Sequence, residues 1–306
     1  MRLTGPGNTP SWTPPSESVI GRSPMCTRQL DAADVSKEHA SLRWTGARWE
    51  LRDLNSRNGT FAGGVKLGPG DVAEVVVGMT VRFGASAVFE VADDAPPPPM
   101  ALAVEAGDWC IASGQLLALP DESNPEATIH RDAQGRWLHE RDGAVTAVEH
   151  GDAVSAGGQT WRLYLPSTDE QTAESLDAQL SLATTRLTFL VSRDEEHVQV
   201  LAESSGRQVD LKARAHHYVL LTLARRRDDD ERAGVPAAEQ GWVYHDALAR
   251  MLSTARTHIN VAVYRLRKQL QDAGFIDAAQ CIERRLSTGQ LRIGLSQFEI
   301  VPTTSP

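Results

Sequence analysis

The sequence has few cysteines and no long apolar run. Three cysteines, Cys26, Cys110 and Cys281, lie far apart in the chain of 306 residues. Neither a disulfide framework nor a metal-binding knuckle is expected from them, which fits a reducing compartment. No stretch approaches the roughly 20 apolar residues that cross a bilayer, and the N-terminal segment lacks the apolar core of a secretory signal. We therefore expect a cytoplasmic protein that does not enter a membrane.

Motifs of common enzyme families are also missing. The glycine-rich stretch 63–68 does not end in the Gly-Lys-Ser/Thr of a phosphate-binding loop, and the chain shows neither a nucleophile elbow nor the set of kinase motifs. His216 and His217 are adjacent, so on a helix their side chains point about 100° apart and make poor joint metal ligands. We expect no enzymatic activity, no cofactor and no bound metal.

The charge of the chain is unevenly distributed. Hydrophobic residues make up 41% and charged residues 23%, as in globular proteins, and the length suggests about two or three domains. Residues 1–185 carry 14 Lys+Arg and 25 Asp+Glu, whereas residues 186–306 carry 17 and 15. This small positive excess is a weak indication that the C-terminal part has a nucleic-acid partner.

Short strand-like segments, separated by Gly, Asn and Ser turns, dominate residues 1–94. This pattern predicts an all-β sandwich whose loops meet at one end. The candidate strands are residues 2–4, 18–21, 42–44, 49–51, 75–77, 80–83 and 88–91.

The loops of this predicted sandwich contain side chains that suit a phosphate group. They are Arg22, Ser36, Lys37, Arg57 and Asn58. A guanidinium makes charge-assisted hydrogen bonds to phosphate oxygens, and Ser, Lys and Asn supply further donors. Such a site needs no nucleophile–base pair, because its task is recognition.

Three ordered motif pieces carry a family resemblance. Gly21-Arg22, Ser36-x-x-His39 and Asn58-Gly59-Thr60 resemble the forkhead-associated domain, a reader of phosphothreonine peptides, over roughly residues 1–91. The resemblance implies that Arg22, Ser36, Lys37 and Arg57 grip the phosphate, that Asn58 holds the peptide backbone, and that Gly21, His39, Gly59 and Thr60 are structural residues of the binding loops. The implied partner is a Thr-phosphorylated protein, either a Ser/Thr kinase or its substrate. The alternative is a sandwich that kept its turns but binds nothing.

Residues 95–166 divide into a linker and a second β segment. Four consecutive prolines, Pro96 to Pro99, predict a stiff linker over residues 95–100. Residues 101–166 contain a fainter β pattern, in which residues 135–142 echo residues 47–53. Because this segment lacks all three motif pieces, we expect a degenerate forkhead-associated-like domain that does not read phosphothreonine. A short unrelated β unit is the alternative. Residues 167–185 are polar and predict a second linker.

Residues 186–300 change from a strand pattern to a helical one. Strands are expected within residues 186–211, helices over residues 213–226, 244–252 and 254–273, and a hairpin over residues 281–293. Between the first two helices we expect an acidic loop with the run Asp228–Glu231. The third helix has an apolar stripe of Ile259, Val263, Leu266 and Leu270, and Ser253 or Thr254 is its candidate N-cap.

The side of this third helix opposite the apolar stripe suits a DNA groove, since Arg reads guanine edges and Lys neutralises phosphates. The order of elements and the motif of residues 259–268 resemble the winged helix–turn–helix of OmpR/PhoB-type response regulators. The resemblance implies that Val261, Tyr264 and Arg265 face bases and that Arg267 and Lys268 face phosphates. The full candidate DNA-binding set is Thr257, His258, Val261, Tyr264, Arg265, Arg267 and Lys268 on the helix with Arg284 and Arg285 on the hairpin.

The chain departs from that family in several places. The family commonly has two basic residues at the positions of Tyr264 and Arg265, and its hairpin arginines lie nearer the tip than Arg284 and Arg285. The receiver domain that usually accompanies this winged helix is missing.

Two hypotheses follow from the sequence. In the first, the chain is a regulator that couples Ser/Thr-kinase signalling to double-stranded DNA and transcription control. In the second, it is a phospho-dependent adaptor whose winged helix contacts protein rather than DNA. The expected fold is multidomain: an N-terminal all-β sandwich, a degenerate β unit and a C-terminal α+β winged helix–turn–helix.

Overall fold

The computed structural model of the chain describes residues 1–7, 10–167, 180–204, 206–286 and 288–303. It consists of two compact units. The first contains Met1–Met100 and Tyr164–Glu174, and the second contains Ala101–Leu163 and Ser175–Pro306. The second unit therefore joins the middle β segment to the helical C-terminal part, which the sequence had suggested to be separate domains.

The first unit is a β-sandwich of two five-stranded sheets, as predicted. One sheet has the order β1-β10-β9-β6-β7 and the other the order β3-β2-β4-β5-β8. The strands are β1 (Arg2–Thr4), β2 (Glu17–Gly21), β3 (Arg28–Gln29), β4 (Ala40–Trp44), β5 (Trp49–Asp53), β6 (Thr60–Ala62), β7 (Val65–Lys66), β8 (Val72–Val75), β9 (Thr80–Phe83) and β10 (Ala87–Asp93).

Alternating burial along the strands explains this sandwich. In β4 and β5, every second residue is buried and the residues between them are partly or fully exposed. Trp44 and Trp49 face each other across the pair, with ring centroids 5.5 Å apart. The predicted strand at residues 75–77 is shifted, because β8 ends at Val75 while Val76 and Val77 lie exposed in the following turn.

The predicted linker at residues 95–100 is partly packed. Trp49 Nε1 donates to the carbonyl of Ala95 at 3.0 Å, and Pro97 and Pro99 are buried. Met100 already belongs to the next strand. The proline run is therefore extended, but it is not a free spacer along its whole length.

The middle sandwich, which we define as strands β11 to β18, belongs to the second unit. Its sheets have the orders β12-β11-β18-β17 and β13-β14-β15-β16. The strands are β11 (Met100–Ala103), β12 (Trp109–Ile111), β13 (Leu117–Leu119), β14 (Ala127–Arg131), β15 (Trp137–Arg141), β16 (Ala144–Ala147), β17 (Ala153–Ala156) and β18 (Gln159–Tyr164).

The strand order of the middle sandwich parallels that of the N-terminal one. The run β11-β18-β17 corresponds to β1-β10-β9, and β13-β14-β15-β16 corresponds to β2-β4-β5-β8. Where the N-terminal sandwich inserts β6 and β7, the middle one joins β15 directly to β16 through Asp142 and Gly143. This likeness agrees with the expected degenerate repeat, which stays a prediction.

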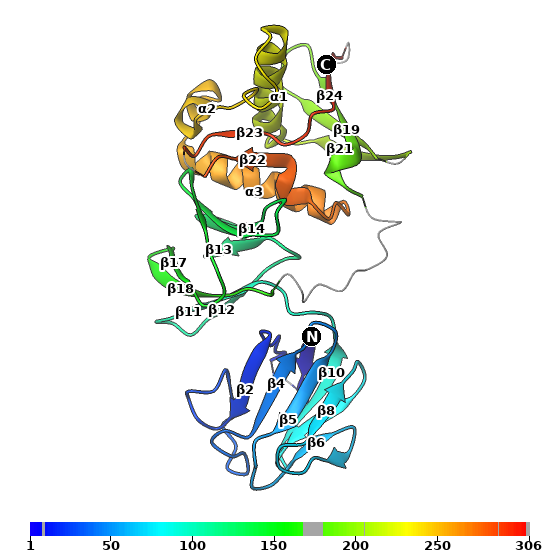
Figure 1. The fold of residues 1–306 in the computed structure, drawn as a ribbon, viewed down its shortest axis with the longest axis vertical. Helices are drawn as coiled ribbons and strands as arrows, with labels where there is room; N and C mark the ends of the chain where they lie inside the picture. Colours follow the sequence, from blue (N-terminus) through cyan, green and yellow to red (C-terminus); the bar gives the residue numbers. More distant parts are fainter. Residues whose placement is uncertain (8–9, 168–179, 205, 287, 304–306) are drawn as a thin grey trace. The chain divides into compact units, whose positions relative to one another are not determined.

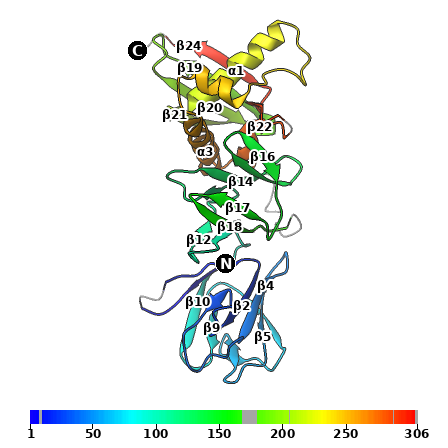
Figure 2. The same cartoon turned by 90° about the vertical axis from the view of Figure 1, so that its left-hand side faces the viewer.

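The C-terminal part combines a sheet, three helices and a hairpin (Figures 1 and 2). Its sheet has the order β21-β20-β19-β24, with β24 parallel to β19. The elements are the 3-10 turn η3 (Leu182–Thr184), β19 (Thr185–Val191), β20 (Val198–Ser204), β21 (Arg207–Ala213), α1 (His217–Arg232), α2 (His245–Met251), α3 (Arg256–Asp272), η4 (Ala278–Cys281), β22 (Ile282–Arg284), β23 (Leu291–Ile293) and β24 (Phe298–Pro302). Its main hydrophobic cluster is drawn only from residues 180–300.

Three boundaries in this part differ from the sequence prediction. Helix α1 runs through the acidic stretch to Arg232, because Arg226 pairs with Asp230 and Arg232 with Asp228 at helical spacing.

Helix α3 begins after Ala255 without a side-chain cap, so Ser253 and Thr254 do not cap it.

The predicted linker 167–185 ends earlier, since Leu180 and Leu182 are buried in the core and β19 begins at Thr185. Residues 168–179 of that linker lie outside the described residues. Strand β24 had not been predicted.

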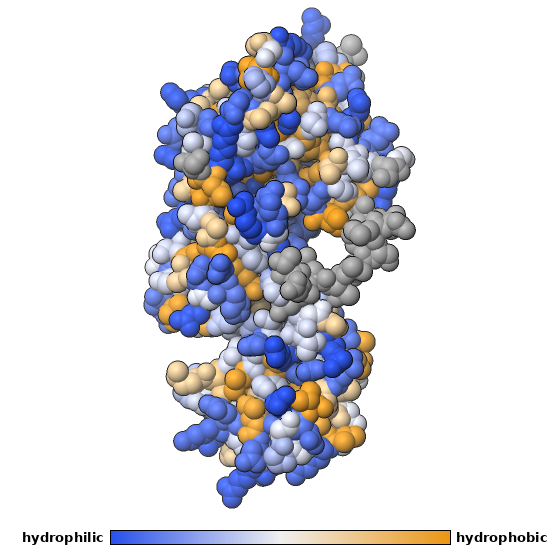
Figure 3. All heavy atoms as spheres, in the orientation of Figure 1, coloured by the Kyte–Doolittle hydropathy of each residue, from blue (hydrophilic) through white to orange (hydrophobic). Residues whose placement is uncertain are grey.

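The surface shows hydrophobic and hydrophilic side chains interspersed. On the face drawn in Figure 3, apolar residues form several separate groups among hydrophilic ones. Exposed apolar side chains in small groups are ordinary for a folded protein. Among the described residues, no helix has the length and apolar character that crossing a membrane requires.

Truncation of Phe189 should destabilise the C-terminal part. Phe189 is fully buried in β19, whereas its neighbour Thr188 is half-buried. We expect Phe189→Ala to lower the free energy of unfolding by about 3–5 kcal/mol and Thr188→Ala to lower it much less. Urea unfolding of both variants measures this difference, and equal losses would contradict the assigned core.

Candidate functional site

Backbone hydrogen bonds bring the first two motif pieces together. Arg22 N donates to Ser36 O at 2.9 Å, and Ser23 N donates to Lys37 O at 3.0 Å. Gly21 is required for this close approach, because a Cβ at that position would lie 2.2 Å from Lys37 O. Arg22, Ser36 and Lys37 are thereby held next to one another at the end of the sandwich.

Side-chain hydrogen bonds attach the third motif piece to the same place. Ser36 Oγ accepts from Arg57 N at 3.0 Å, and Asn58 Nδ2 donates to Asp34 O at 2.7 Å. Since the hydroxyl oxygen of Ser36 accepts this bond, its own proton remains available to donate to a ligand. The five predicted ligand-binding residues therefore converge.

His39 braces the loops from beneath, as the resemblance implied. Its Nδ1 accepts from Ser36 N at 3.0 Å and its Nε2 lies 3.1 Å from Gly59 O. Because Nδ1 is the acceptor, Nε2 carries the proton and donates to Gly59 O. Burial lowers the pKa of His39 and outweighs the opposing effect of Gly59 O, so the ring is neutral at pH 7.

Sequence reasoning missed two carboxylates that hold these loops. Asp34 accepts hydrogen bonds from Ala85 N and from the amide and hydroxyl of Ser86, and these bonds lower its pKa to about 2. The sequence offered no clear signal for a partner so distant in the chain.

The second missed carboxylate, Asp53, accepts from Ser56 and from Thr60 Oγ1. Burial raises the pKa of Asp53, but these hydrogen bonds together outweigh burial and lower it. The Asp-x-x-Ser spacing was a usable turn signal.

Exposure separates the recognition residues from the structural ones. Arg22, Lys37, Arg57 and Asn58 are exposed and Ser36 is half-buried, whereas Gly21, His39, Gly59 and Thr60 are buried. The end of the sandwich therefore presents three cationic side chains, a hydroxyl and an amide over a rigid base. Such a set can bind a doubly charged oxyanion.

Part of the predicted DNA-binding set is buried, which corrects the sequence interpretation. The side chains of Tyr264, Arg267 and Arg284 are 3%, 1% and 2% exposed. Tyr264 packs on Leu116 and Ala118 of the middle sandwich, and both arginines lie within 3.0 Å of Glu140. In this arrangement these three residues cannot contact DNA.

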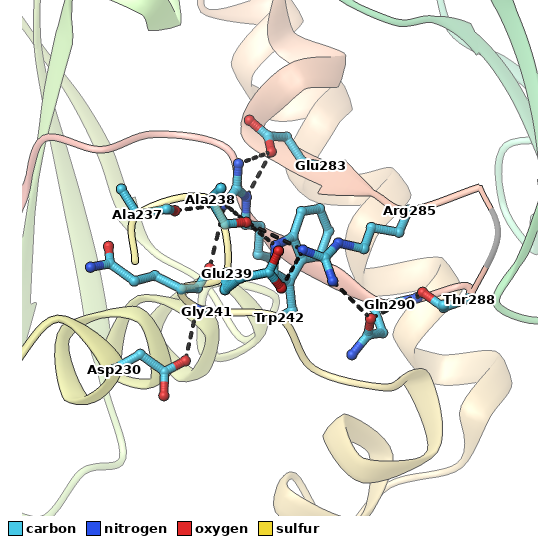
Figure 4. A network of polar contacts seen from close by, with 12 residues as sticks. Asp230, Ala237, Ala238, Glu239, Gly241, Trp242, Glu283, Arg285, Thr288 and Gln290 are labelled. Atoms are coloured by element: carbon cyan, nitrogen blue, oxygen red, sulfur yellow. Dashed lines mark hydrogen bonds and ion pairs between the residues drawn. The ribbon is translucent and has the colours of Figure 1, made fainter. Parts of the chain in front are cut away.

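The second hairpin arginine is held within its own domain (Figure 4). Arg285 pairs with Glu239 at 2.8 Å and stacks on Trp242 with its guanidinium carbon 4.3 Å from the ring centroid. Arg292 stacks on the same ring at 4.4 Å and pairs with Glu283. Arg285 must therefore leave Glu239 and the Trp242 ring before it can contact a phosphate.

The remaining candidates differ in exposure. Thr257, His258 and Arg265 are exposed, and Val261 and Lys268 are half-buried. Lys268 pairs with Asp272 one helical turn away. Of the predicted set, Arg265 is thus the cation that α3 presents most openly. Within the described part of the chain, no group of three or more His, Cys, Asp or Glu residues is arranged to hold a metal ion.

Comparison with known proteins identifies the N-terminal sandwich. The family profile of the FHA (forkhead-associated) domain matches residues 18–84. Human nuclear inhibitor of protein phosphatase 1 is 38% identical over 71 residues, which is 22% of this chain and 20% of that protein. The chain therefore matches about a fifth of the length of this curated relative. These sequence matches show that residues 18–84 form an FHA domain, as the resemblance implied.

Solved structures similar to this region include a domain from a study of phosphothreonine-dependent FHA domain interactions. It is 25% identical with a TM-score of 0.27, and the match covers 29% of this chain and 91% of that one. Another is Mycobacterium tuberculosis EmbR in complex with a low-affinity phosphopeptide, at 22% identity and a TM-score of 0.28, covering 30% of this chain and 24% of that one. The assignment of residues 18–84 depends on the sequence matches.

Protonation of His39 should loosen the recognition loops. The pKa of His39 is lower in the folded chain than the value of about 6.5 in an unfolded one. The corresponding stability is fully present above about pH 6.5 and is lost as the pH falls through the folded-state pKa. We expect the free energy of unfolding to fall below pH 6.5 and to fall less in His39→Gln, which lacks the titrating ring. Urea unfolding between pH 5 and 8 tests this, and the same pH dependence in both proteins would contradict the role of His39.

Proposed function

We propose that the FHA domain of this chain binds phosphothreonine peptides through Arg22, Ser36, Lys37, Arg57 and Asn58. The observation that supports this most strongly is the convergence of these donors, which lie on three separate loops and are joined by the hydrogen bonds of Ser36. A phosphothreonine carries a charge of about −1.5 to −2 at pH 7, and the three cationic side chains complement it. Asn58 would hold the peptide backbone beside the phosphate.

Loss of the phosphate ligands should abolish binding selectively. Arg22→Ala and Ser36→Ala each remove a donor to a charged group, which typically costs about 1.5–3 kcal/mol, or roughly a ten- to hundredfold loss of affinity. Phosphothreonine peptides are first selected from a degenerate library, and their binding is then measured by calorimetry. The matched control is Arg52→Ala, which removes an exposed arginine from β5 of the same sandwich. Unchanged affinity in the Arg22 and Ser36 variants would reject the pocket.

We further propose that residues 180–303 are a winged helix–turn–helix that addresses double-stranded DNA. The order of sheet, three helices and terminal hairpin supports this, as does the exposed Arg265 on the amphipathic helix α3. Together with the FHA domain, this domain would make the chain a non-enzymatic regulator that couples Ser/Thr-kinase signalling to transcription. The burial of Arg267 and Arg284 favours the adaptor alternative, in which the same domain contacts a protein.

Salt-titrated DNA binding separates the two alternatives. A fragment of residues 180–306 contains the complete C-terminal core and should bind mixed-sequence duplex DNA with a steep salt dependence. We expect Lys268→Ala to lower the slope of log affinity against log salt by about one and Arg265→Ala to reduce affinity several-fold. Arg186→Ala on β19 is the charge-matched control. No binding at low salt would favour the adaptor.

A further inference from the structure

The middle sandwich covers one side of helix α3 along its whole length. At the first turn, Arg256 Nη2 donates to Asp142 O at 3.1 Å. At the last turn, the amide of Gln271 donates to Ser113 O at 2.7 Å and accepts from Gln115 N at 3.1 Å. Figures 1 and 2 both place β14 beside α3.

The covering surface is the outer face of the sheet β13-β14-β15-β16. Strand register places Ala118, Thr128, His130 and Glu140 on the same face, and all four are buried. Tyr264 of α3 packs on this face against Ala118. The outer face of a sandwich sheet is normally solvated, so its burial here marks a dedicated interface.

A buried charge cluster lies at the centre of this interface. Arg267 donates from Nη1 and Nη2 to the two oxygens of Glu140, both at 3.0 Å. Burial acts to raise the pKa of Glu140, but Arg267 and Arg284 outweigh it and hold the pKa well below its usual range. Burial followed by Arg267 lowers the pKa of His130. Its Nε2 donates to Glu140 across the 2.9 Å contact, and its Nδ1 lies 3.1 Å from Arg131 O.

Glu140 accepts hydrogen bonds from Arg267 in the way that a DNA phosphate would. The two parallel hydrogen bonds from Arg267 are the geometry that a guanidinium uses for both carboxylates and phosphates. The surrounding segment is acidic, since residues 101–163 contain four Lys+Arg and ten Asp+Glu. On this acidic segment, the carboxylate at the arginine fork is an electrostatic substitute for a backbone phosphate.

Steric exclusion acts in the same direction. The major groove is about 12 Å wide, and a helix with its side chains is about 10–12 Å across. A groove that holds the exposed side of α3 therefore has no room for a β-sheet packed on the flank that carries Tyr264 and Arg267. DNA and the middle sandwich exclude each other along this flank.

The cluster is not fully satisfied. One carboxylate faces two guanidinium groups, so a net positive charge is buried. Arg284 Nε lies 3.0 Å from Glu140 Oε2 without hydrogen-bond alignment, and its Nη1 has no hydrogen-bond partner in the described structure. Buried donors without partners destabilise the state that contains them. The closed arrangement is therefore open to competition by a better anion.

We propose that the middle sandwich is an intramolecular inhibitor, which covers the flank of α3 that carries Tyr264 and Arg267 and must separate from it before the helix enters a DNA groove. This rests on the proposed DNA-binding function of residues 180–303. Glu140 is the central residue of the closed state, because its removal leaves two buried cations without a counter-charge.

The opening of the interface is measured in the full chain without DNA. In a chain whose three cysteines are replaced by alanine, Ala118→Cys and Ala127→Cys place single thiols on opposite faces of the same sheet. Both alanines are 1% exposed. Adding Glu140→Gln should speed labelling at position 118 by at least about tenfold and leave position 127 unchanged. Glu149→Gln, a loss of charge at an exposed site, should change neither. Unchanged labelling at position 118 would overturn the proposal.

DNA binding then tests inhibition. The wild-type chain should bind mixed-sequence duplex at least about tenfold more weakly than the fragment 180–306, and Glu140→Gln should restore binding. Adding Arg265→Ala should reduce the restored binding several-fold. If Glu140→Gln impairs folding, the comparison of the wild-type chain with the fragment still tests whether the middle sandwich inhibits DNA binding. If the fragment binds DNA but no more tightly than the wild-type chain, the proposed inhibition is wrong while DNA binding stands. If the fragment binds no DNA, the proposed DNA-binding function is wrong as well.

Discussion

The fork between Glu140 and Arg267 is the interaction on which the second unit depends. It joins a strand of the middle sandwich to the longest helix of the C-terminal part, across 127 positions of the chain. Ion pairs buried to this degree are costly unless both partners are well satisfied. Arg267 meets that condition through Glu140, Ala279 O and Ile282 O, while Arg284 does not. A single carboxylate thus contacts both α3 and the hairpin from the middle sandwich.

The FHA domain depends on the opposite arrangement of charge. There the buried groups are a neutral histidine and a carboxylate with several hydrogen-bond donors, and the cations point into solvent. The rigid base fixes the positions of the loops, and the exposed side chains remain free to meet a ligand. The two units therefore use arginine in different ways, as a ligand-facing donor in one and as an internal contact in the other.

Sequence reasoning was most successful where structure follows from local pattern. The strands of the sandwich and the loop residues around Arg22 could be predicted because alternation and turn residues are local signals. The role of Asp34 could not be predicted, because its partners Ala85 and Ser86 are distant in sequence. The same limit applies to α3. Its apolar stripe was evident from spacing, but Tyr264, Arg267 and Arg284 look like surface residues in any helical wheel or hairpin. Only the fold shows that a separate sheet covers them, and strand β24 pairs with β19 across a similar distance.

The short turn between β15 and β16 distinguishes the middle sandwich from the N-terminal one. In the N-terminal sandwich the chain leaves β5 at the corresponding end and forms the loop of Arg57 and Asn58 before β6. In the middle sandwich, Asp142 and Gly143 close that end so tightly that a Cβ on Gly289 would lie 2.5 Å from Gly143 O. A peptide-reading loop of the N-terminal length would have no space there. The short turn instead brings this end of the sandwich against His245 of α2 and Arg256 of α3 in the same unit.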